Sequence, residues 1–222
     1  MKFFIRRWGG CLLLLLISLY SCKTGNPDQR KARDEVLRKE ANRWNYQEID
    51  SSVQLLHNGD LVLRTGADAT SYMLRQMNLT NKTYSHCGIV MIEDGYPFVY
   101  HSIGGEDNPD ERLRRDSASF FFNPVNNERL GIARLDLSEL QIDQLHHIVK
   151  RYYKMAIPFD MDFDLKTNDK FYCAEFVYKS ICEATADTGY FSRTQLLARN
   201  YVGVDNLYDK RHAKIICDIR FK

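Results

Sequence analysis

Hydrophobic and polar positions along the chain change their period several times, and each period predicts an element. Short apolar runs bounded by turn residues predict strands at 61–63, 85–92 and 96–102, and the segment LGIARLDL predicts another at 130–137. Glu93-Asp94-Gly95 separates the second run from the third, and an acidic residue followed by glycine is typical of a hairpin turn. We therefore expect 85–92 and 96–102 to pair as a β-hairpin.

Two segments have helical periods. The first spans 67–81, and its expected core-facing residues are Tyr72, Leu74, Met77 and Leu79. The second spans 138–155 and opens with Ser138 and Gln141 at the spacing of a capping box. Its apolar stripe consists of Leu140, Leu145, Ile148, Val149 and Tyr152. The adjacent His146 and His147 cannot both face one metal ion, and a solvated helix surface accounts for them.

Two further segments show neither the period of a strand nor that of a helix. Segment 104–129 reads as a long loop or irregular insertion, although Phe120–Phe122 must be covered by other parts of the protein. Segment 23–45 is polar and charged, and it reads as a tether that passes into a short helix around Asp34–Trp44.

Residues 1–21 predict a secretory signal peptide, because positive charges precede a short apolar run that ends at small residues. The run is too short to span a membrane. The sequence Leu-Tyr-Ser-Cys at 19–22 resembles a bacterial lipobox, in which the cysteine is acylated and becomes the new N-terminus. We therefore expect a lipid anchor at Cys22, a tether and short helix over 22–45, and a domain over 46–222. A soluble exported protein cut nearby is the alternative.

Charge excludes one class of partner. The chain has 31 basic and 29 acidic residues, and removal of the signal peptide takes away Lys2, Arg6 and Arg7 without any acid. The remaining chain is nearly neutral, so no overall basic bias indicates nucleic-acid binding.

Four cysteines remain outside the signal peptide and the anchor, namely Cys87, Cys173, Cys182 and Cys217. Their spacing matches neither a disulfide framework nor a CxxC metal site. An exported protein that keeps isolated cysteines has either buried them or uses a thiol, so each one needs its own explanation.

The expected hairpin brings two histidines together. With the turn centred on Asp94-Gly95, paired residues have numbers that sum to about 189, so His86 lies opposite residue 103 and near His101 on the partner strand. Alternation puts Cys87 on the other face of the strand from His86. We interpret Cys87 as a core residue that points away from the histidines.

Cys173 lies where a helix is expected to begin, because Asn168 or Asp169 can act as its N-cap. Free N–H groups and the positive end of the helix dipole stabilise a thiolate there. Cys182 is nine residues further, on the opposite side of the helix, where packing explains it. For Cys173 alone, packing and catalysis are equally good readings, and the two histidines favour catalysis.

A helix cysteine, a strand histidine and a second polar residue form the nucleophile, base and orienting group of acyl transfer through a thioester. Tyr84 and Tyr172 are candidates for an oxyanion donor, but core or rim packing explains them better. Glu175 has a structural reading near the helix start and an alternative one as a ligand for a substrate amine. Asp60 has a structural role in the turn before a strand.

The motifs NGDLVLRTG, YSHCGIV, FVYHS, PFDMDFD and FYCAEFVYKSI resemble the permuted papain-like amidases of the YiiX group, which are relatives of the NlpC-type cell-wall peptidases. The resemblance covers residues 55–182 and implies an α+β, circularly permuted papain-like fold, with an antiparallel sheet packed against helices. It implies that Cys173 is the nucleophile, His86 the general base and His101 the third polar residue. That third residue is often Glu in the YiiX group, whereas His agrees with the non-permuted peptidases.

The resemblance implies an exported cysteine hydrolase that cleaves an amide or isopeptide bond, with peptidoglycan stem peptides as a candidate substrate, and it implies no cofactor. A zinc site at His86 and His101 lacks a third ligand at motif spacing. Two alternatives stay open. The same fold hosts lipid-directed acyltransferases and lipases, which share the catalytic residues. A non-catalytic binding lipoprotein of the cell envelope is the other.

Overall fold

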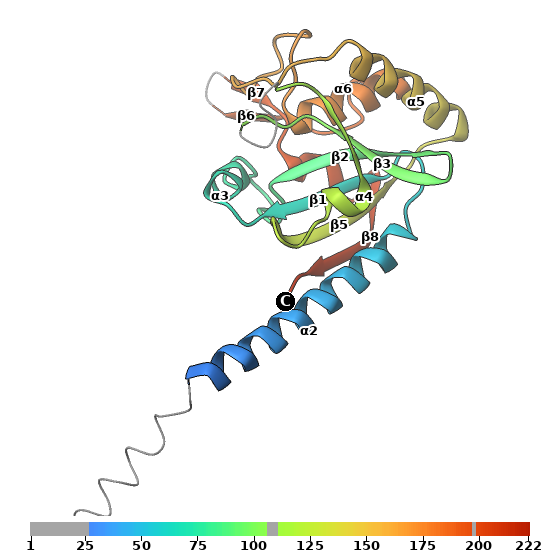
Figure 1. Ribbon diagram of the computed structural model, residues 1–222. Helices are drawn as coiled ribbons and strands as arrows, with labels where there is room; N and C mark the ends of the chain where they lie inside the picture. Colours follow the sequence, from blue (N-terminus) through green and yellow to red (C-terminus); the bar gives the residue numbers. More distant parts are fainter. Residues whose placement is uncertain (1–26, 106–110, 197–198) are drawn as a thin grey trace, which may run out of the picture. The chain divides into compact units, whose positions relative to one another are not determined.

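An antiparallel sheet positions the other elements, and Figure 1 shows its strands in a computed structural model that describes residues 27–105, 111–196 and 199–222. The strands lie in the order β4-β3-β2-β1-β5-β8. Their bounds are β1 Leu61–Gly66, β2 His86–Glu93, β3 Tyr96–His101, β4 Arg114–Ser117, β5 Asn127–Leu135 and β8 Ala213–Arg220. A separate pair consists of β6 Thr194–Leu196 and β7 Arg199–Tyr201.

Helices α5 (Glu139–Lys154) and α6 (Cys173–Thr185) cover one face of the large sheet (Figure 1). The opposite face has its own apolar cluster, which includes Ile49 of α2 (Pro27–Val53) and Phe121 of α4 (Ala118–Phe121). The alternation of side chains along each strand assigns them to the two clusters. The remaining helices are α3 (Ala69–Arg75) and the short 3₁₀ helix η1 (Val204–Tyr208).

The predicted hairpin is confirmed with its register. Ile89 pairs with Tyr100, so paired residues have numbers that sum to 189, and Asp94 and Gly95 both have positive φ, of 51° and 82°. Positive φ at both central residues gives the turn the twist that β2 and β3 require. The position of His101 relative to His86 follows from this register.

The helix expected over 138–155 is also confirmed. Ser138 is the N-cap of α5, and its side chain accepts a hydrogen bond from the backbone N–H of Gln141. Leu145, Ile148 and Val149 are buried as expected. Leu140 is exposed, because at ~100° per residue it lies roughly 140° around the helix from Leu145, off the apolar stripe. His146 and His147 are exposed.

The helix predicted over 67–81 is present but shorter, and of its four expected core-facing residues Met77 packs against the core. Helix α3 ends at Arg75 and contains no buried residue, while Tyr72 and Leu79 are exposed. Leu74, which is partly buried, instead lines a cavity. The apolar spacing was helical, but Leu74 faces that cavity and Tyr72 and Leu79 face solvent, while Met77 reaches the core from beyond the end of α3.

The loop predicted over 104–129 is also corrected, because it contains β4, α4 and the start of β5. Phe121 and Phe122 are buried and Phe120 is exposed. Strand β4 reads Arg-Arg-Asp-Ser, which has no apolar alternation because it is the edge strand.

Helix α2 is longer than the short helix expected around Asp34–Trp44. The chain divides into two units between Arg43 and Trp44. In the first unit, residues 30–40 are all exposed. In the second, the side chain of Asn45 bonds to the backbone of Lys222. The expected signal peptide and Cys22 lie outside the described residues, and in the described parts of the chain no helix is long and apolar enough to cross a bilayer.

Candidate functional site

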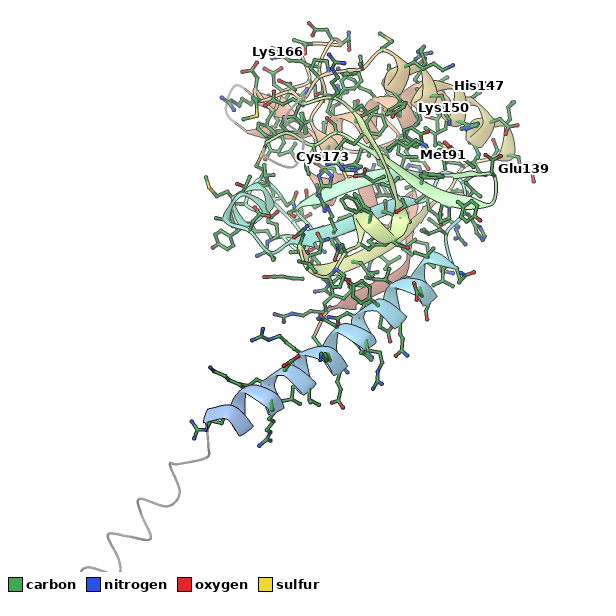
Figure 2. All side chains as sticks on the ribbon, in the orientation of Figure 1. Met91, Glu139, His147, Lys150, Lys166 and Cys173 are labelled. Carbon is green, nitrogen blue, oxygen red and sulfur yellow. The ribbon has the colours of Figure 1, made fainter. Side chains whose placement is uncertain are left out.

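Cys173 is the first residue of α6, and it lies between the helical layer and the sheet (Figure 2). Its side chain is buried, with 8% of the residue exposed. The expected caps, Asn168 and Asp169, do not cap this helix. Tyr172 occupies the N-cap position, and its backbone N–H donates to the Glu175 carboxylate at 3.3 Å. Glu175, in the first turn, thus bonds the N–H of the N-cap residue, while the first N–H groups of α6 itself have no side-chain cap among the described residues.

The sulfur of Cys173 is surrounded by donors. A hydrogen bond from the Cys87 thiol lowers the pKa of Cys173; burial opposes this effect, while backbone N–H groups of Ala174, Cys87 and Cys173 itself reinforce it. Burial raises the pKa of Cys87 well above its ordinary value, and the bond to Cys173 raises it further. Of this pair, Cys173 is therefore the sulfur that ionises and Cys87 the one that keeps its proton.

Cys87 lies where alternation placed it, and it has a contact that the sequence did not indicate. It is a fully buried core residue and it does face away from the histidine side of β2, as alternation predicted. However, α6 packs on that same side, so the Cys87 thiol meets Cys173. The nucleophile candidate and the histidines therefore belong to opposite faces of the sheet.

His86 and His101 are in direct contact. His86 Nε2 lies 2.9 Å from His101 Nδ1, and both rings are buried. His101 Nε2 lies 3.0 Å from Oδ2 of Asp116 on β4, and Arg114 donates to Oδ1 of the same carboxylate at 2.9 Å. The hydrogen bonds thus run without a break from His86 on β2 through His101 on β3 to Asp116 on β4.

Strand register explains this chain of contacts. His101 lies opposite Arg114 in the β3–β4 ladder, so Asp116 is its diagonal neighbour on the same face. Gly88 follows His86 by two residues on β2, and the 189 register places it opposite His101, so His86 is the diagonal neighbour of His101. A Cβ at Gly88 would lie 2.8 Å from the carbonyl oxygen of Tyr100 and 3.0 Å from Cβ of His101. The absent side chain leaves room for the contact between the two histidines.

Phe121 covers both imidazoles, with ring centroids 5.7 Å from His86 and 5.1 Å from His101. Burial lowers the pKa of His86 well below its ordinary value, and the charges of Arg64, His101 and Arg114 lower it further. Burial also lowers the pKa of His101, to about 4, although Asp116 opposes that shift. Both rings are therefore neutral near pH 7 in the resting protein.

For Asp116, burial works against ionisation, but hydrogen bonds from His101 and Arg114 outweigh it and lower the pKa of the carboxyl group. Asp116 is therefore an anion at the far end of the contact chain.

A cavity of about 780 Å³ contains both His86 and Cys173 in its lining. Apolar side chains contribute to this lining from Leu74, Ile103, Val125, Phe159, Met161 and Phe163. Its ionisable lining residues besides the candidate site are Arg64 and Asp68. Asp68 is already used as the N-cap of α3, where Ser71 donates to it. The cavity is large enough for a substrate of drug size or larger.

No hydrogen bond joins Cys173 to His86 within the described part of the chain. The structure brings His86 and His101 into contact and places Cys173 and His86 in one cavity, while the sulfur bonds to Cys87. Catalytic contacts are often long in the absence of substrate and tighten when it binds.

Other residues named from the sequence have structural partners. Glu175 is fully buried and forms an ion pair with Lys179 at 2.8 Å, and Asp60 pairs with Arg134 at 2.9 Å. The Tyr84 hydroxyl donates to Asp218 at 2.8 Å, and the Tyr172 hydroxyl accepts from the backbone of Val202 at 2.9 Å. The Tyr84 O–H is thus committed to Asp218, whereas the Tyr172 hydroxyl accepts a hydrogen bond and keeps its own proton as a donor.

Sequence reasoning missed Asp116 and the role of Cys87. Asp116 lies in the segment interpreted as a loop, and a strand there would have been needed to place it beside His101. For Cys87, alternation gave the correct face of β2, but only the packing of α6 shows that Cys173 lies on that face.

Comparison with known proteins adds information on the fold. No protein-family model matches the chain, and no curated protein matches it. The chain is similar to the crystal structure of the metalloprotein YiiX from Escherichia coli O157:H7, with a TM-score of 0.61 and 18% sequence identity. The similarity covers 74% of this chain and 98% of YiiX. The chain therefore has a YiiX-like fold that combines helices with an antiparallel sheet.

Proposed function

We propose that this protein is a cysteine hydrolase of the permuted papain-like fold that cleaves an amide or isopeptide bond through a thioester on Cys173. One observation carries the proposal. Cys173, whose pKa is lowered at the start of α6, shares a cavity with His86, and Nε2 of His86 is already hydrogen-bonded to His101. This is the arrangement of an activated nucleophile, its base and an orienting group. The order of histidine before cysteine along the chain agrees with a permuted fold.

In the first step, His86 accepts the proton of the Cys173 thiol, and the thiolate attacks the carbonyl carbon of the substrate. The C–N bond then breaks, and the protonated His86 gives its proton to the leaving amine. The products are an acyl-Cys173 thioester and a free amine.

In the second step, His86 removes a proton from water, and the resulting hydroxide attacks the thioester. The C–S bond breaks, the acid product leaves, and His86 returns the proton to the sulfur of Cys173. No metal or redox cofactor enters the balance of these steps.

The backbone N–H of Cys173 is the first donor for the developing oxyanion, because the first N–H groups of a helix have no partner within it. The same groups lower the pKa of the thiol in the resting protein. Binding of substrate would redirect them from the sulfur to the oxyanion.

Peptidoglycan stem peptides remain the candidate substrate of the amidase. Acyl transfer from a lipid is a second candidate, and one observation favours it. Val125 and Met161 line the cavity and are nevertheless exposed, at 71% and 65%. Exposed apolar side chains at a cavity are typical of sites that receive an apolar ligand.

A metal centre does not fit the donor set. The described residues contain no group of three or more His, Cys, Asp or Glu side chains arranged to hold a metal ion. His86 Nε2 and His101 Nδ1 face one another at hydrogen-bonding distance, so these two atoms do not converge on a common point. YiiX is described as a metalloprotein, and the described residues of this chain hold no matching donor set.

We further propose that the protein is exported and anchored by lipid at Cys22 to the cell envelope, in the periplasm or outer membrane. The proposal depends on residues 1–22 of the sequence. Expression with labelled fatty acid tests it: the native chain should incorporate label, and Cys22→Ser should leave the membrane fraction. Unchanged fractionation of Cys22→Ser would favour a plain secretory signal.

The test of the reaction is to trap the thioester. The full-length chain is incubated separately with digested peptidoglycan and with phospholipid, quenched in acid and analysed by mass spectrometry. A peptide-derived acyl group on Cys173 supports the amidase, and a fatty acyl group supports the second candidate. His86→Ala should suppress either adduct, and His101→Ala should suppress it less, because the proton acceptor remains.

Cys182→Ser is the matched control, because Cys182 lies on the same helix and away from the cavity. It should form the adduct as the native chain does. If no substrate gives an adduct on the folded protein, or if Cys173→Ser keeps full activity, the non-catalytic binding lipoprotein replaces the enzyme.

A further inference from the structure

We infer that Asp116 is a positioning residue that sets the tautomers of His101 and His86 and thereby makes His86 Nδ1 the basic atom. The inference deepens the proposed function and rests on it for its catalytic meaning. It is carried by the two hydrogen bonds that join His86, His101 and Asp116.

The chain of hydrogen bonds has a direction. An ionised carboxylate only accepts hydrogen bonds, so Asp116 requires His101 to carry its proton on Nε2. A neutral His101 then has a bare Nδ1, which can only accept. The facing Nε2 of His86 must therefore be the protonated one, and Nδ1 of His86 is left without a proton.

We call the hydrogen-bonded group of His86, His101 and Asp116 the relay. The charges around it support the neutral state of both rings. Arg64, on β1, lies opposite His86 in the β1–β2 ladder, and Arg114 contacts Asp116. The positive charges of both arginines lower the pKa of each imidazole and so disfavour its cationic form. Arg114 also keeps Asp116 ionised, since it donates to Oδ1 while His101 donates to Oδ2.

The same arrangement stabilises the charge that forms during the reaction. When His86 takes the thiol proton on Nδ1, its Nε2–H still donates to His101, and His101 still donates to Asp116. No proton has to move along the relay, because every bond already has the correct direction. The fixed carboxylate lies one imidazole away from the new positive charge.

Asp116→Asn should reverse this direction. Arg114 donates to one end of the side chain, so the Asn oxygen is expected to stay with Arg114 and its NH₂ group to face His101 Nε2. His101 would then carry its proton on Nδ1, and His86 would carry its own on Nδ1. The base would hold a proton on the atom that has to accept one.

The experiment reads the tautomers directly. The full-length chain, with ¹⁵N in its six histidines, is studied near pH 7 by long-range ¹H–¹⁵N correlation, and His86 and His101 are assigned with single His→Gln variants. We expect the Nε2–H tautomer at both residues in the native chain and the Nδ1–H tautomer at both in Asp116→Asn. Asp218→Asn is the matched control, because Asp218 bonds to Arg129 and Tyr84 away from the relay.

Activity gives a second reading. Asp116→Asn should lower kcat by about 10- to 100-fold with little change in KM and should shift the acid limb of the pH profile, and Asp116→Glu should restore part of the rate. The inference would be overturned if His101 of the native chain were doubly protonated, or if His86 of the native chain carried its proton on Nδ1. Both outcomes are measured on the native chain, so they do not depend on a variant that folds. If the tautomers are as expected but no substrate is turned over, the proposed hydrolase fails while the tautomer assignment stands.

Discussion

The two faces of the sheet hold their ionisable groups in different ways near the start of β2. On the α4 face, His86, His101 and Asp116 are held by strand pairing and diagonal neighbours alone. On the α6 face, Cys173 meets Cys87 only because a helix packs on the sheet. The acid–base group is thus fixed by local register and the nucleophile by tertiary packing, so changes to the two faces should have separable effects.

Gly88→Ala should have the largest effect, because the new Cβ meets the carbonyl oxygen of Tyr100, Cβ of His101 and the side chain of Val99. The nearest atom to that Cβ would be Cγ1 of Val99, at 2.6 Å, on a β-branched side chain with little freedom to turn. We expect a loss of about 3 kcal/mol in the free energy of unfolding, measured by urea denaturation. The contact between the histidines should open, and turnover should fall. Gly189→Ala is the control, since its new Cβ would have a single neighbour at 3.3 Å. Equal stability of the two variants would show that the close approach at Gly88 is not required.

Acid should weaken the histidine face. The pKa of His101 is lowered to about 4 by burial, whereas its ordinary value is near 6.5. Between these two pH values the unfolded chain binds a proton at His101 that the folded chain does not. Stability is therefore present above about pH 6.5 and is lost as pH falls toward 4, by about 2 kcal/mol between pH 6.5 and pH 5 for this residue alone. His101→Gln removes this proton uptake, and its unfolding free energy should depend less steeply on pH. A variant with the native slope would contradict a buried neutral His101.

The α6 side should respond to pH with the opposite sign. Burial raises the pKa of Glu175 to about 7, although Lys179 opposes the shift. The folded protein then holds a proton that the unfolded chain loses above pH 4.5, so the stability contributed by Glu175 falls as pH rises, by about 1–2 kcal/mol between pH 5 and pH 6.5. Glu175→Gln should lack this decline, whereas Glu183→Gln, on the same helix but exposed, should keep it. Identical pH slopes in both variants would count against the buried acid.

Cys87 should have the smallest effect, confined to the thiol. Cys87→Ala removes the donor that lowers the pKa of Cys173, so alkylation of Cys173 at pH 6.5 should slow by about 3- to 10-fold. Cys87→Ser keeps an O–H donor and should recover most of the rate. If Ala and Ser behave alike, the hydrogen bond between the two side chains is not what lowers the pKa.

Local patterns were sufficient for one part of the site. The Asp94-Gly95 turn fixed the hairpin register, and the register placed His86 beside His101. The capping box at Ser138 was likewise local and was confirmed. In each case the deciding residues are close in sequence or joined by a tight turn.

The remaining features depend on contacts that the local sequence does not encode. Asp116 became visible only through the pairing of a polar edge strand, and the side chain that bonds at the start of α6 is that of Glu175 rather than of Asn168 or Asp169. The apolar residues of 67–81 have helical spacing, but Leu74 on α3 lines a cavity. Tertiary packing decided each of these.

The central claim is that Cys173 is the reactive thiol, with a pKa lowered by its hydrogen-bond donors, and its alkylation rate tests this most directly. The folded full-length chain is treated with iodoacetamide at pH 6.5, and modification of each cysteine is followed by mass spectrometry. We predict that Cys173 reacts far faster than Cys87 and Cys182, whose pKa values are raised by burial, and faster than the half-buried Cys217. Equal labelling of all four, or labelling of Cys217 alone, would contradict the account.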